Sequence, residues 1–292
     1  MSIRVGFIGC GNMGGALAMA AAKSQKKMPI ELYLADAFQE KAEELAQEIE
    51  KVLVDVDNKM MLVNYNIKAV QTTKVVSNEI IAETCDYIFL GVKPQMMREM
   101  LQSIAPILKN RLERFVLVTM AAGLSIETIR EMAGQNYPII RLMPNTPVFV
   151  GKGMILFTTS DISEEEKKNF LQFMQNAGNF DEIPESMIDA GSAVSGCGPA
   201  FVYQFIEALA DGAVACGVPR AKAIEYSAQT LSGAAEMVLQ TKKHPGELKD
   251  AVCSPAGSTI QGVRALEANG FRSGVIEAVI SAYEKTKELG KK

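Results

Sequence analysis

The chain has 292 residues, of which 48% are hydrophobic and 22% are charged, and this ordinary globular composition excludes a disordered or fibrous protein. Its 30 Lys and Arg residues and 34 Asp and Glu residues give a net charge of −4 without a long basic block, so nucleic acid and anionic membrane surfaces are poor partners. No apolar run is long enough to cross a bilayer and no leader-like segment precedes the first strand pattern, so we expect a cytoplasmic, soluble protein.

The first half of the chain alternates short strand patterns with helical patterns. Strands are predicted at residues 4–8, 31–35, 87–92, 115–120, 139–143 and 154–158. Helices are predicted at residues 14–23 and, from a charged sequence with a helical period, from Gln39 to about Lys51. This alternation is typical of βαβ units with right-handed crossovers. It predicts an α/β fold with a Rossmann-type, mostly parallel sheet that helices cover on both faces.

From Ser186 onward the sequence changes to Ala-rich helical segments with almost no strand pattern. Helices are predicted at residues 201–216, 221–239 and 273–289, with turn signals at residues 217–219, 244–246 and 269–270. We place the domain boundary near Pro184. The chain is therefore expected to form a sheet-containing domain over residues 1–184 and an all-helical domain over residues 185–292.

The helical half predicts a homo-oligomer. In its first helix the small residues Ala208, Gly212 and Cys216 recur every four positions, which lets a second helix approach closely. The broad apolar faces of residues 201–216 and 221–239 likewise favour helix-on-helix burial between subunits. The alternative is that these helices cover one another within a single chain.

A glycine-rich segment, Gly9-Cys10-Gly11-Asn12-Met13-Gly14, joins the first predicted strand to the first predicted helix. Alone this spacing is weak evidence, and a plain structural turn is the alternative. In this context the three glycines suit a tight turn, the close approach of a pyrophosphate, and close helix–sheet packing. The phosphates are expected at the amino end of the helix, where unpaired amides and the positive end of the dipole lie.

Asp36 ends the second predicted strand. A carboxylate at this place accepts hydrogen bonds from the adenosine ribose and repels a 2′-phosphate, so the sequence favours NADH over NADPH. Two alternatives stay open, because the nearby Lys41 could reach back toward a phosphate and Asp36 could instead cap the following helix.

Three later turns follow predicted strands at the sheet edge where open α/β sheets bind their ligands. They are residues 91–94, 120–123 and 143–147. Ordinary strand-ending turns are the alternative interpretation.

The segment 254–261 is the strongest feature of the helical half. Pro255 has no amide hydrogen, and the small residues Ala256 and Gly257 leave the backbone accessible. Ser258 with Gln261 forms the pattern of a capping box. Such a turn gathers amides and hydroxyls at a helix amino terminus, where a substrate carboxylate can bind. The alternative is a helix cap without a ligand.

A metal site is not expected. The five cysteines are scattered and never in a Cys-x-x-Cys spacing, and the single histidine, His244, lies in a turn pattern. We interpret the cysteines as reduced thiols that serve as small apolar residues. The lone histidine also argues against a Ser-His-Asp relay.

Five segments occur in the order found in pyrroline-5-carboxylate reductases, and the resemblance covers nearly the whole chain. They are Gly9–Gly14, Val92-Lys93-Pro94, Asn145-Thr146-Pro147, Ser195-Gly196-Cys197-Gly198-Pro199-Ala200 and His244-Pro245 through Thr259. The resemblance implies reduction of 1-pyrroline-5-carboxylate to L-proline by NAD(P)H, the last step of proline biosynthesis. It also implies an amino-terminal Rossmann domain and a helical carboxyl-terminal dimerisation domain, in dimers that often assemble into decamers.

By matching position, the resemblance also implies site residues. The cofactor positions are Ile8, Gly9, Cys10, Gly11, Asn12, Met13, Gly14, Asp36, Asn78, Gly91, Val92, Lys93, Pro94, Met120, Ala121, Ala122 and Asn145. The substrate positions are Glu185, Ser254, Gly257, Ser258 and Thr259, and Thr259 is expected to be the catalytic residue. The chain also departs from the family pattern twice, since Ala256 stands where glycine is expected and the stretch Phe38–Val76 looks longer.

The chemistry asks little of side chains, because a protonated cyclic imine is already an electrophile and the dihydronicotinamide supplies hydride. Our hypothesis is that Thr259 hydrogen-bonds the ring nitrogen while amides of residues 257–259 hold the substrate carboxylate. The cleft is expected between the Rossmann edge of one subunit and the helical domain of its partner.

Two other interpretations compete with this one. A β-hydroxyacid dehydrogenase shares the two-domain plan, but residues 195–219 contain no Lys, Arg or His that could act as its general acid–base residue. A regulatory protein that binds a dinucleotide without turnover is the other, and an intact turn at residues 254–259 is hard to explain in such a sensor.

Overall fold

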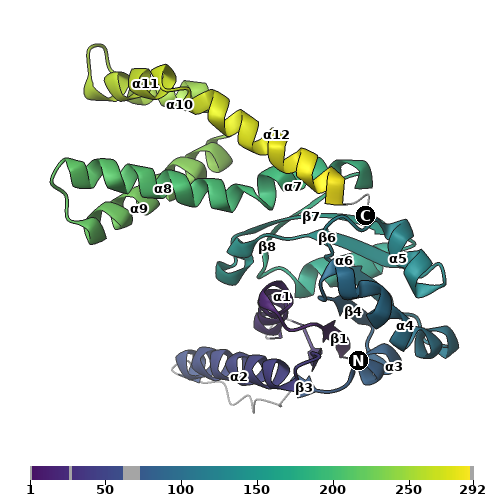
Figure 1. Ribbon diagram of the computed structural model, residues 1–292. Helices are drawn as coiled ribbons and strands as arrows, with labels where there is room; N and C mark the ends of the chain where they lie inside the picture. Colours follow the sequence, from purple (N-terminus) through teal and green to yellow (C-terminus); the bar gives the residue numbers. More distant parts are fainter. Residues whose placement is uncertain (1, 26–27, 62–72, 290–292) are drawn as a thin grey trace. The chain divides into compact units, whose positions relative to one another are not determined.

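The computed structural model describes residues 2–25, 28–61 and 73–289 (Figure 1). Their contacts define two compact units, one of Met1–Gly196 with Lys285–Lys292 and one of Cys197–Glu284. None of the helices in the described ranges combines the length and the hydropathy that a membrane span needs.

The first unit is built on a sheet with the strand order β3-β2-β1-β4-β5-β6-β7-β8. The strands are β1 (Ile3–Ile8), β2 (Ile30–Ala35), β3 (Thr73–Val75), β4 (Tyr87–Leu90), β5 (Val116–Thr119), β6 (Ile139–Met143), β7 (Gly153–Ser160) and β8 (Gly178–Glu182). Neighbouring strands are parallel except β6 and β7, which run antiparallel. The prediction of a mostly parallel Rossmann-type sheet is confirmed.

Helices cover both faces of this sheet, as predicted (Figure 1). In chain order they are α1 (Asn12–Lys23), α2 (Gln39–Met61), α3 (Asn78–Thr84), α4 (Pro94–Asn110), α5 (Ile126–Ala133), the 3-10 helix η1 (Thr146–Val150), α6 (Glu164–Phe173) and α7 (Glu185–Ser195). One apolar core joins the sheet to α1, α2 and α6, and a second joins the opposite face to α3, α4 and α5. Successive strand residues face opposite cores, so Phe89 lies in the first and Ile88 in the second.

The sequence predictions missed two strands and the length of one helix. β3 has only three residues, and β8 is an edge strand whose Asn, Asp and Glu side chains are exposed, so neither carries a strong apolar pattern. Helix α2 continues well beyond Lys51 to Met61. Of the long stretch 38–76, residues 62–72 lie outside the described part of the chain.

The second unit is helical throughout its described residues, as predicted. Its helices are α8 (Gly198–Ala215), α9 (Arg220–Thr241), α10 (Pro245–Val252), α11 (Ser258–Ala268) and α12 (Phe271–Leu289), the last of which ends in the first unit. The buried side chains among residues 197–284 are those of Ala210, Ala223 and Ser227. Large apolar side chains such as Tyr203 and Met237 are 60% and 52% exposed. The alternative that these helices cover one another within one chain is therefore wrong.

Candidate active site

The carboxyl ends of β1, β2 and β4 are joined by backbone hydrogen bonds. Gly9 N donates to Ala35 O at 2.8 Å. Gly91 N donates to Ile8 O at 2.7 Å. The two glycines are so close that a Cβ on Gly91 would stand 2.6 Å from Gly9 O. The turns after β1 and β4, both predicted to bind the cofactor, therefore meet at one edge of the sheet.

Each glycine of the loop between β1 and α1 has its own structural role. Gly9 has a φ of 103°, which side chains rarely adopt. A Cβ on Gly14 would lie 2.1 Å from Gly9 O, so only glycine lets α1 pack this closely on the strand. A Cβ on Gly11 would meet no atom within 4 Å, so this position leaves open space above the loop. These are the three roles that the spacing predicts.

The loop leads directly into α1, whose N-cap is Gly11. Gly15 N closes the first helical turn onto Gly11 O at 2.7 Å. The three amides between them have no earlier carbonyl within the helix, and they stand at the positive end of its dipole. These amides and the open space at Gly11 fit the pyrophosphate of a dinucleotide.

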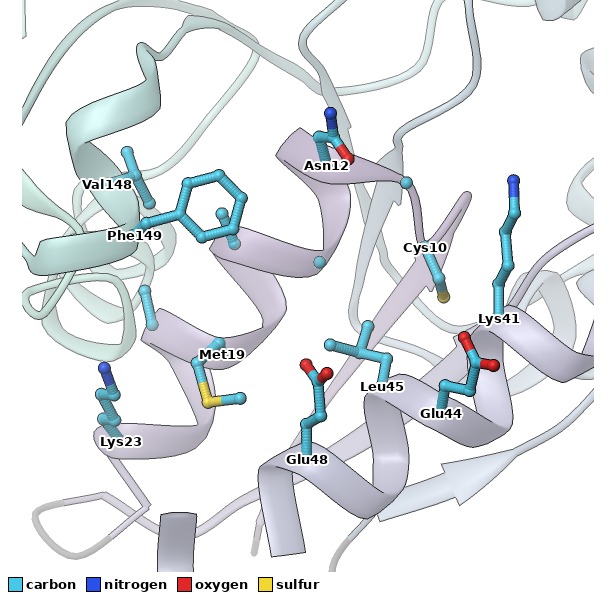
Figure 2. A pocket seen from close by; sticks show the side chains of 14 residues that line it. Cys10, Asn12, Met19, Lys23, Lys41, Glu44, Leu45, Glu48, Val148 and Phe149 are labelled. Atoms are coloured by element: carbon cyan, nitrogen blue, oxygen red, sulfur yellow. The ribbon is translucent and has the colours of Figure 1, made fainter. Parts of the chain in front are cut away.

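A cavity of about 300 Å³ lies beside the loop, lined by residues of α1, α2 and η1 (Figure 2). Cys10, Gly11 and Asn12 of the loop form part of its lining. Lys41 approaches it from α2 and Phe149 from η1 (Figure 2). The glycine loop therefore opens onto a hollow rather than onto packed side chains.

Asp36 follows β2 and is bonded through both carboxylate oxygens. Its Oδ2 accepts from Cys10 N at 2.8 Å, which holds the carboxylate beside the glycine loop. Its Oδ1 accepts from Phe38 N at 3.0 Å, which closes a short turn after the strand. Helix α2 begins only at Gln39, so Asp36 does not occupy its N-cap position, and the helix-capping alternative is wrong.

Cys10 places a buried thiol in the glycine loop. Its Sγ lies 3.5 Å from Ala35 O. Burial, and then the negative charge of Asp36, raises the pKa of this thiol to about 12. The thiol is therefore neutral at physiological pH, in keeping with a cysteine that serves as a small apolar residue.

The other predicted cofactor positions lie at neighbouring strand ends and at one helix start. Gly91–Pro94 form the turn from β4 into α4, with Lys93 at the N-cap. Met120–Ala122 follow β5, which lies next to β4 and parallel to it, so both turns lie at the same sheet edge. Asn78 is the first residue of α3.

Asn145 is buried, and both ends of its amide are engaged within the protein. Nδ2 donates to Ser195 O at 2.8 Å, and Oδ1 accepts from Met154 N at 3.0 Å. The side chain thus ties the start of η1 to β7 and to the end of α7. Its contact with a cofactor stays a prediction, and such a contact would use the second amide hydrogen or the second lone pair of Oδ1.

Glu185 lies in an ionic network that the sequence did not reveal. Its Oε1 accepts from Ile126 N at 2.8 Å and from the Arg141 guanidinium at 3.0 Å. The same guanidinium donates to Asp189 Oδ1 at 2.9 Å, and the Arg141 side chain is only 5% exposed. The available signal was one arginine inside the apolar strand 139–143. This network ties α7 to the start of α5, which follows the 120–123 turn.

The turn between α10 and α11 contains the remaining predicted substrate positions. Ala256 has a φ of 59°, the left-handed conformation for which glycine is the usual residue, and this is the physical reason why glycine is expected at this position. Gly257 N donates to Ser254 O at 3.0 Å, so this amide is used inside the turn. A Cβ on Gly257 would lie 2.4 Å from Ser254 Oγ, so a larger residue there would have to displace the Ser254 side chain.

The predicted capping box at Ser258 is wrong. Gly257, in extended backbone, is the N-cap of α11 and no side chain caps the helix. Ser258 is already the first helical residue, one position too late to cap. The exposed residues Ser258 and Thr259 therefore present their backbone amides and their side-chain hydroxyls at the start of α11.

A parallel sheet with this glycine loop and an acidic residue after the second strand defines the class of nicotinamide-dinucleotide-dependent oxidoreductases. The family described as NADP oxidoreductase, coenzyme F420-dependent, matches residues 4–123. The family described as pyrroline-5-carboxylate reductase dimerisation matches residues 185–289.

Individual relatives match the whole chain. A pyrroline-5-carboxylate reductase of Escherichia coli (strain K12) is 37% identical over 292 residues and covers 100% of both sequences. The pyrroline-5-carboxylate reductase of Glycine max is 36% identical and covers 99% of this chain and 96% of its own. The crystal structure of a Plasmodium falciparum pyrroline carboxylate reductase with NADP bound superposes with a TM-score of 0.78 at 32% identity, covering 99% and 98% of the two chains. The chain belongs to the pyrroline-5-carboxylate reductase family.

Proposed function

We propose that this protein reduces 1-pyrroline-5-carboxylate to L-proline with NAD(P)H, the last step of proline biosynthesis. The observation that carries the proposal is identity of 36–37% to reductases of that name over essentially the full length. The glycine loop and the 254–259 turn supply the two kinds of ligand contact that the reaction needs. The β-hydroxyacid dehydrogenase interpretation has no comparable support.

The first unit supplies the cofactor contacts. The amides that follow Gly11 bind the pyrophosphate, and the turns 91–94 and 120–122 line the path of the nicotinamide half along the sheet edge. When bound, the dihydronicotinamide supplies the hydride. The protein's part is to hold the cofactor in one orientation and to exclude water from the reacting carbon.

The cradle predicts opposite effects for two similar substitutions. Gly11→Ala puts a methyl group into open space, so folding is retained while the Kd for NADH rises about tenfold or more, because the pyrophosphate can no longer approach. Gly14→Ala puts its methyl group 2.1 Å from Gly9 O, so the free energy of unfolding falls by about 1–3 kcal/mol. Urea unfolding measures the free energy of unfolding of each variant, and NADH fluorescence titration measures its Kd for NADH. An equal Kd for NADH in Gly11→Ala and the wild type would show that the pyrophosphate does not bind at this loop.

The second unit supplies the substrate contacts. Because Gly257 N is used inside the turn, the amides of Ser258 and Thr259 are the ones left to hold the substrate carboxylate. The Thr259 hydroxyl accepts a hydrogen bond from the N–H of the protonated imine and so keeps the electrophile charged and oriented. Glu185 Oε1, which is bonded twice, positions α7 and α5, and the other carboxylate oxygen is the one left for the predicted contact with the substrate.

Thr259 is tested by a pair of substitutions. Thr259→Ala removes one hydrogen bond to a charged group, worth about 1.5–3 kcal/mol, so kcat/KM for the imine falls about tenfold or more. Thr259→Ser keeps the hydroxyl and retains most of the activity. Unchanged steady-state kinetics in Thr259→Ala would take this residue out of the mechanism.

We propose that the enzyme prefers NADH. The Asp36 carboxylate, fixed beside the loop by Cys10 N, accepts the ribose hydroxyls and repels a 2′-phosphate. The ratio of kcat/KM for NADH to that for NADPH tests this preference. Asp36→Ser should shift the ratio toward NADPH by about tenfold or more, and a wild-type enzyme with a strong NADPH preference would overturn this account of Asp36.

The proposed organisation is a dinucleotide-binding domain over residues 1–184 and a helical dimerisation and substrate-binding domain over residues 185–292. We propose a homodimer that can assemble further into a decamer, and analytical ultracentrifugation distinguishes the two. A cytoplasmic, reducing compartment suits the free thiols of Cys10, Cys85, Cys197, Cys216 and Cys253.

The deciding assay follows NADH oxidation with and without 1-pyrroline-5-carboxylate. Substrate-dependent consumption of NADH together with formation of L-proline is the expected result. Binding of NADH without consumption in either reaction would favour the regulatory, non-catalytic interpretation instead.

A further inference from the structure

Phe38 is an exposed aromatic residue at the cofactor edge of the sheet. It follows β2 by three positions, and its side chain is 67% exposed. An apolar ring of this size gains free energy from being covered, yet it stands immediately beside Asp36 at the carboxyl end of a parallel strand. Ligands of open α/β sheets bind along this edge.

A chain of contacts connects Phe38 to the glycine loop and fixes its position. Asp36 accepts from Cys10 N in the loop through Oδ2 and from Phe38 N through Oδ1, at 2.8 and 3.0 Å. On the other side, Lys41 N donates to Phe38 O at 2.9 Å. The backbone that carries the ring is thus held by the same carboxylate that is proposed to meet the ribose.

Lys41 also contacts the ring itself. Its Nζ lies 5.0 Å from the centroid of the Phe38 ring, a cation–π arrangement. Lys41 belongs to the lining of the cavity beside the glycine loop (Figure 2). Lys41 therefore connects the Phe38 ring to the lining of that cavity, and most of the ring's surface is still uncovered.

We propose that Phe38 is the platform on which the adenine of the dinucleotide stacks. From the pyrophosphate cradle, the adenosine half extends toward the end of β2, where Asp36 meets the ribose and Phe38 is the next large side chain along the chain. Any base presents a π-face to an aromatic ring, and the ammonium of Lys41 strengthens the stack. This inference rests on the proposed dinucleotide site. It adds Phe38 to the cofactor contacts already proposed for the glycine loop and Asp36.

The same geometry bears on the choice between the two cofactors. Lys41 is the cation nearest in sequence to Asp36 that a 2′-phosphate could use, and its ammonium is engaged over the Phe38 ring. A ligand with a 2′-hydroxyl needs no cation there, whereas a 2′-phosphate has to draw Lys41 off the ring. Phe38 thereby favours NADH by holding the competing cation in place.

The test measures binding of ADP-ribose, which carries the adenosine and the pyrophosphate but no nicotinamide, by isothermal titration calorimetry on the full chain. Phe38→Ala should raise the Kd of ADP-ribose about fivefold or more, the range expected for loss of one base–aromatic stack. Phe38→Tyr keeps the ring and should stay within about twofold of the wild type. Leu112→Ala, which removes another exposed apolar side chain (97%) before β5, is the matched control and should leave the Kd unchanged.

Reduced nicotinamide mononucleotide, which lacks the adenosine, supplies a second measurement. Phe38→Ala should raise the KM for NADH while leaving kcat/KM with the mononucleotide unchanged. An unchanged Kd of ADP-ribose in Phe38→Ala would overturn the stacking proposal. An equal loss of kcat/KM with NADH and with reduced nicotinamide mononucleotide in this variant would also overturn it. Failure of the proposed function has a different signature, because then wild-type protein binds ADP-ribose through Phe38 but does not oxidise NADH with 1-pyrroline-5-carboxylate.

Discussion

The two units of this chain bury their apolar residues in different ways. In the first unit the large side chains Phe7, Phe89, Phe170 and Phe173 are completely buried between the sheet and one layer of helices. In the second unit large apolar side chains remain between 40% and 67% exposed along α8 to α12. The first unit therefore completes its core with its own helices, whereas the helices of the second unit leave apolar faces that they do not cover themselves.

The difference follows from the two kinds of element. A sheet has two faces, and the helices of successive βαβ units return to cover both of them within the same polypeptide. A helix pair such as α8 and α9 has further apolar faces left over once the two helices have packed together. The match of residues 185–289 to a dimerisation family agrees with a second unit whose stability depends on association.

The largest expected effect concerns the internal network of the first unit. Arg141→Met removes a guanidinium that is 5% exposed and leaves Glu185 and Asp189 facing each other without their cation. Because both carboxylates are one-third exposed, the loss should be near the low end for a buried pair, about 3 kcal/mol in the free energy of unfolding.

A matched control is Arg114→Met. Arg114 pairs with Glu166 at the surface and is 57% exposed, so its loss should cost less than about 1 kcal/mol. Urea unfolding of both variants measures the difference. Equal losses would mean that burial of Arg141 contributes nothing and that the first unit is less self-contained than its core indicates.

The second prediction concerns the face of α8. A Cβ on Gly212 would meet no atom of its own chain within 4 Å, and glutamate is a better helix former than glycine. In an isolated chain Gly212→Glu should therefore be neutral or slightly stabilising. If α8 packs against a second subunit, the charge should weaken association by about 2 kcal/mol or more, roughly thirtyfold in the dimer dissociation constant.

Sedimentation velocity over a range of protein concentrations measures that dissociation constant. Wild-type protein should also melt at a temperature that rises with its concentration. A Gly212→Glu variant that stays fully dimeric and melts as the wild type does would place the subunit contact elsewhere in the helical unit.

A smaller effect is expected at the 254–259 turn. Ala256 adopts the left-handed conformation, which costs an L-residue about 1–2 kcal/mol. A glycine there would relieve this strain, but it would also increase the conformational entropy of the unfolded chain, which offsets part of the gain in stability. Ala256→Gly should therefore raise the free energy of unfolding by about 0.5–1 kcal/mol. Thermal unfolding at fixed protein concentration measures it, and a lower melting temperature in the variant would contradict the strain.

The smallest effect concerns a carboxylate at the edge of the sheet. Ser2 Oγ donates to Glu31 Oε1 at 2.6 Å and Lys74 Nζ to Oε2 at 2.9 Å. The hydrogen bond from Ser2, followed by that from Lys74, lowers the pKa of Glu31 to about 2 from 4.5. A lowered pKa in the folded state stabilises the protein above pH 4.5, and this contribution is lost as the pH falls from about 4.5 to about 2.

Glu31→Gln should accordingly lower the free energy of unfolding by about 0.5 kcal/mol at pH 7, a modest value because solvent screens this 30% exposed side chain. The difference from the wild type should shrink as the pH is lowered toward 2. Urea unfolding at pH 7 and near pH 2.5 measures both ends. A difference that grows on acidification would contradict the direction of the pKa shift.

Local sequence patterns determined much of this protein. A buried strand such as β4 is a short, uninterrupted apolar run, and the Ala-rich helices of the second unit are indicated by their composition. The positions of Gly9, Gly11 and Gly14 predicted three different environments, because the turn that contains them is formed by residues that are consecutive in the chain.

Tertiary structure decided the rest, because the deciding contacts join residues that are far apart in the sequence. Arg141 meets Glu185 and Asp189 across more than forty positions, and no local pattern records that pairing. Helix α11 starts one residue earlier than the predicted capping box requires, with Gly257 rather than Ser258 at its N-cap. A local sequence pattern is enough to determine an element whose backbone hydrogen bonds are made by its own residues. The partner of a side chain is determined only when the fold brings distant segments together.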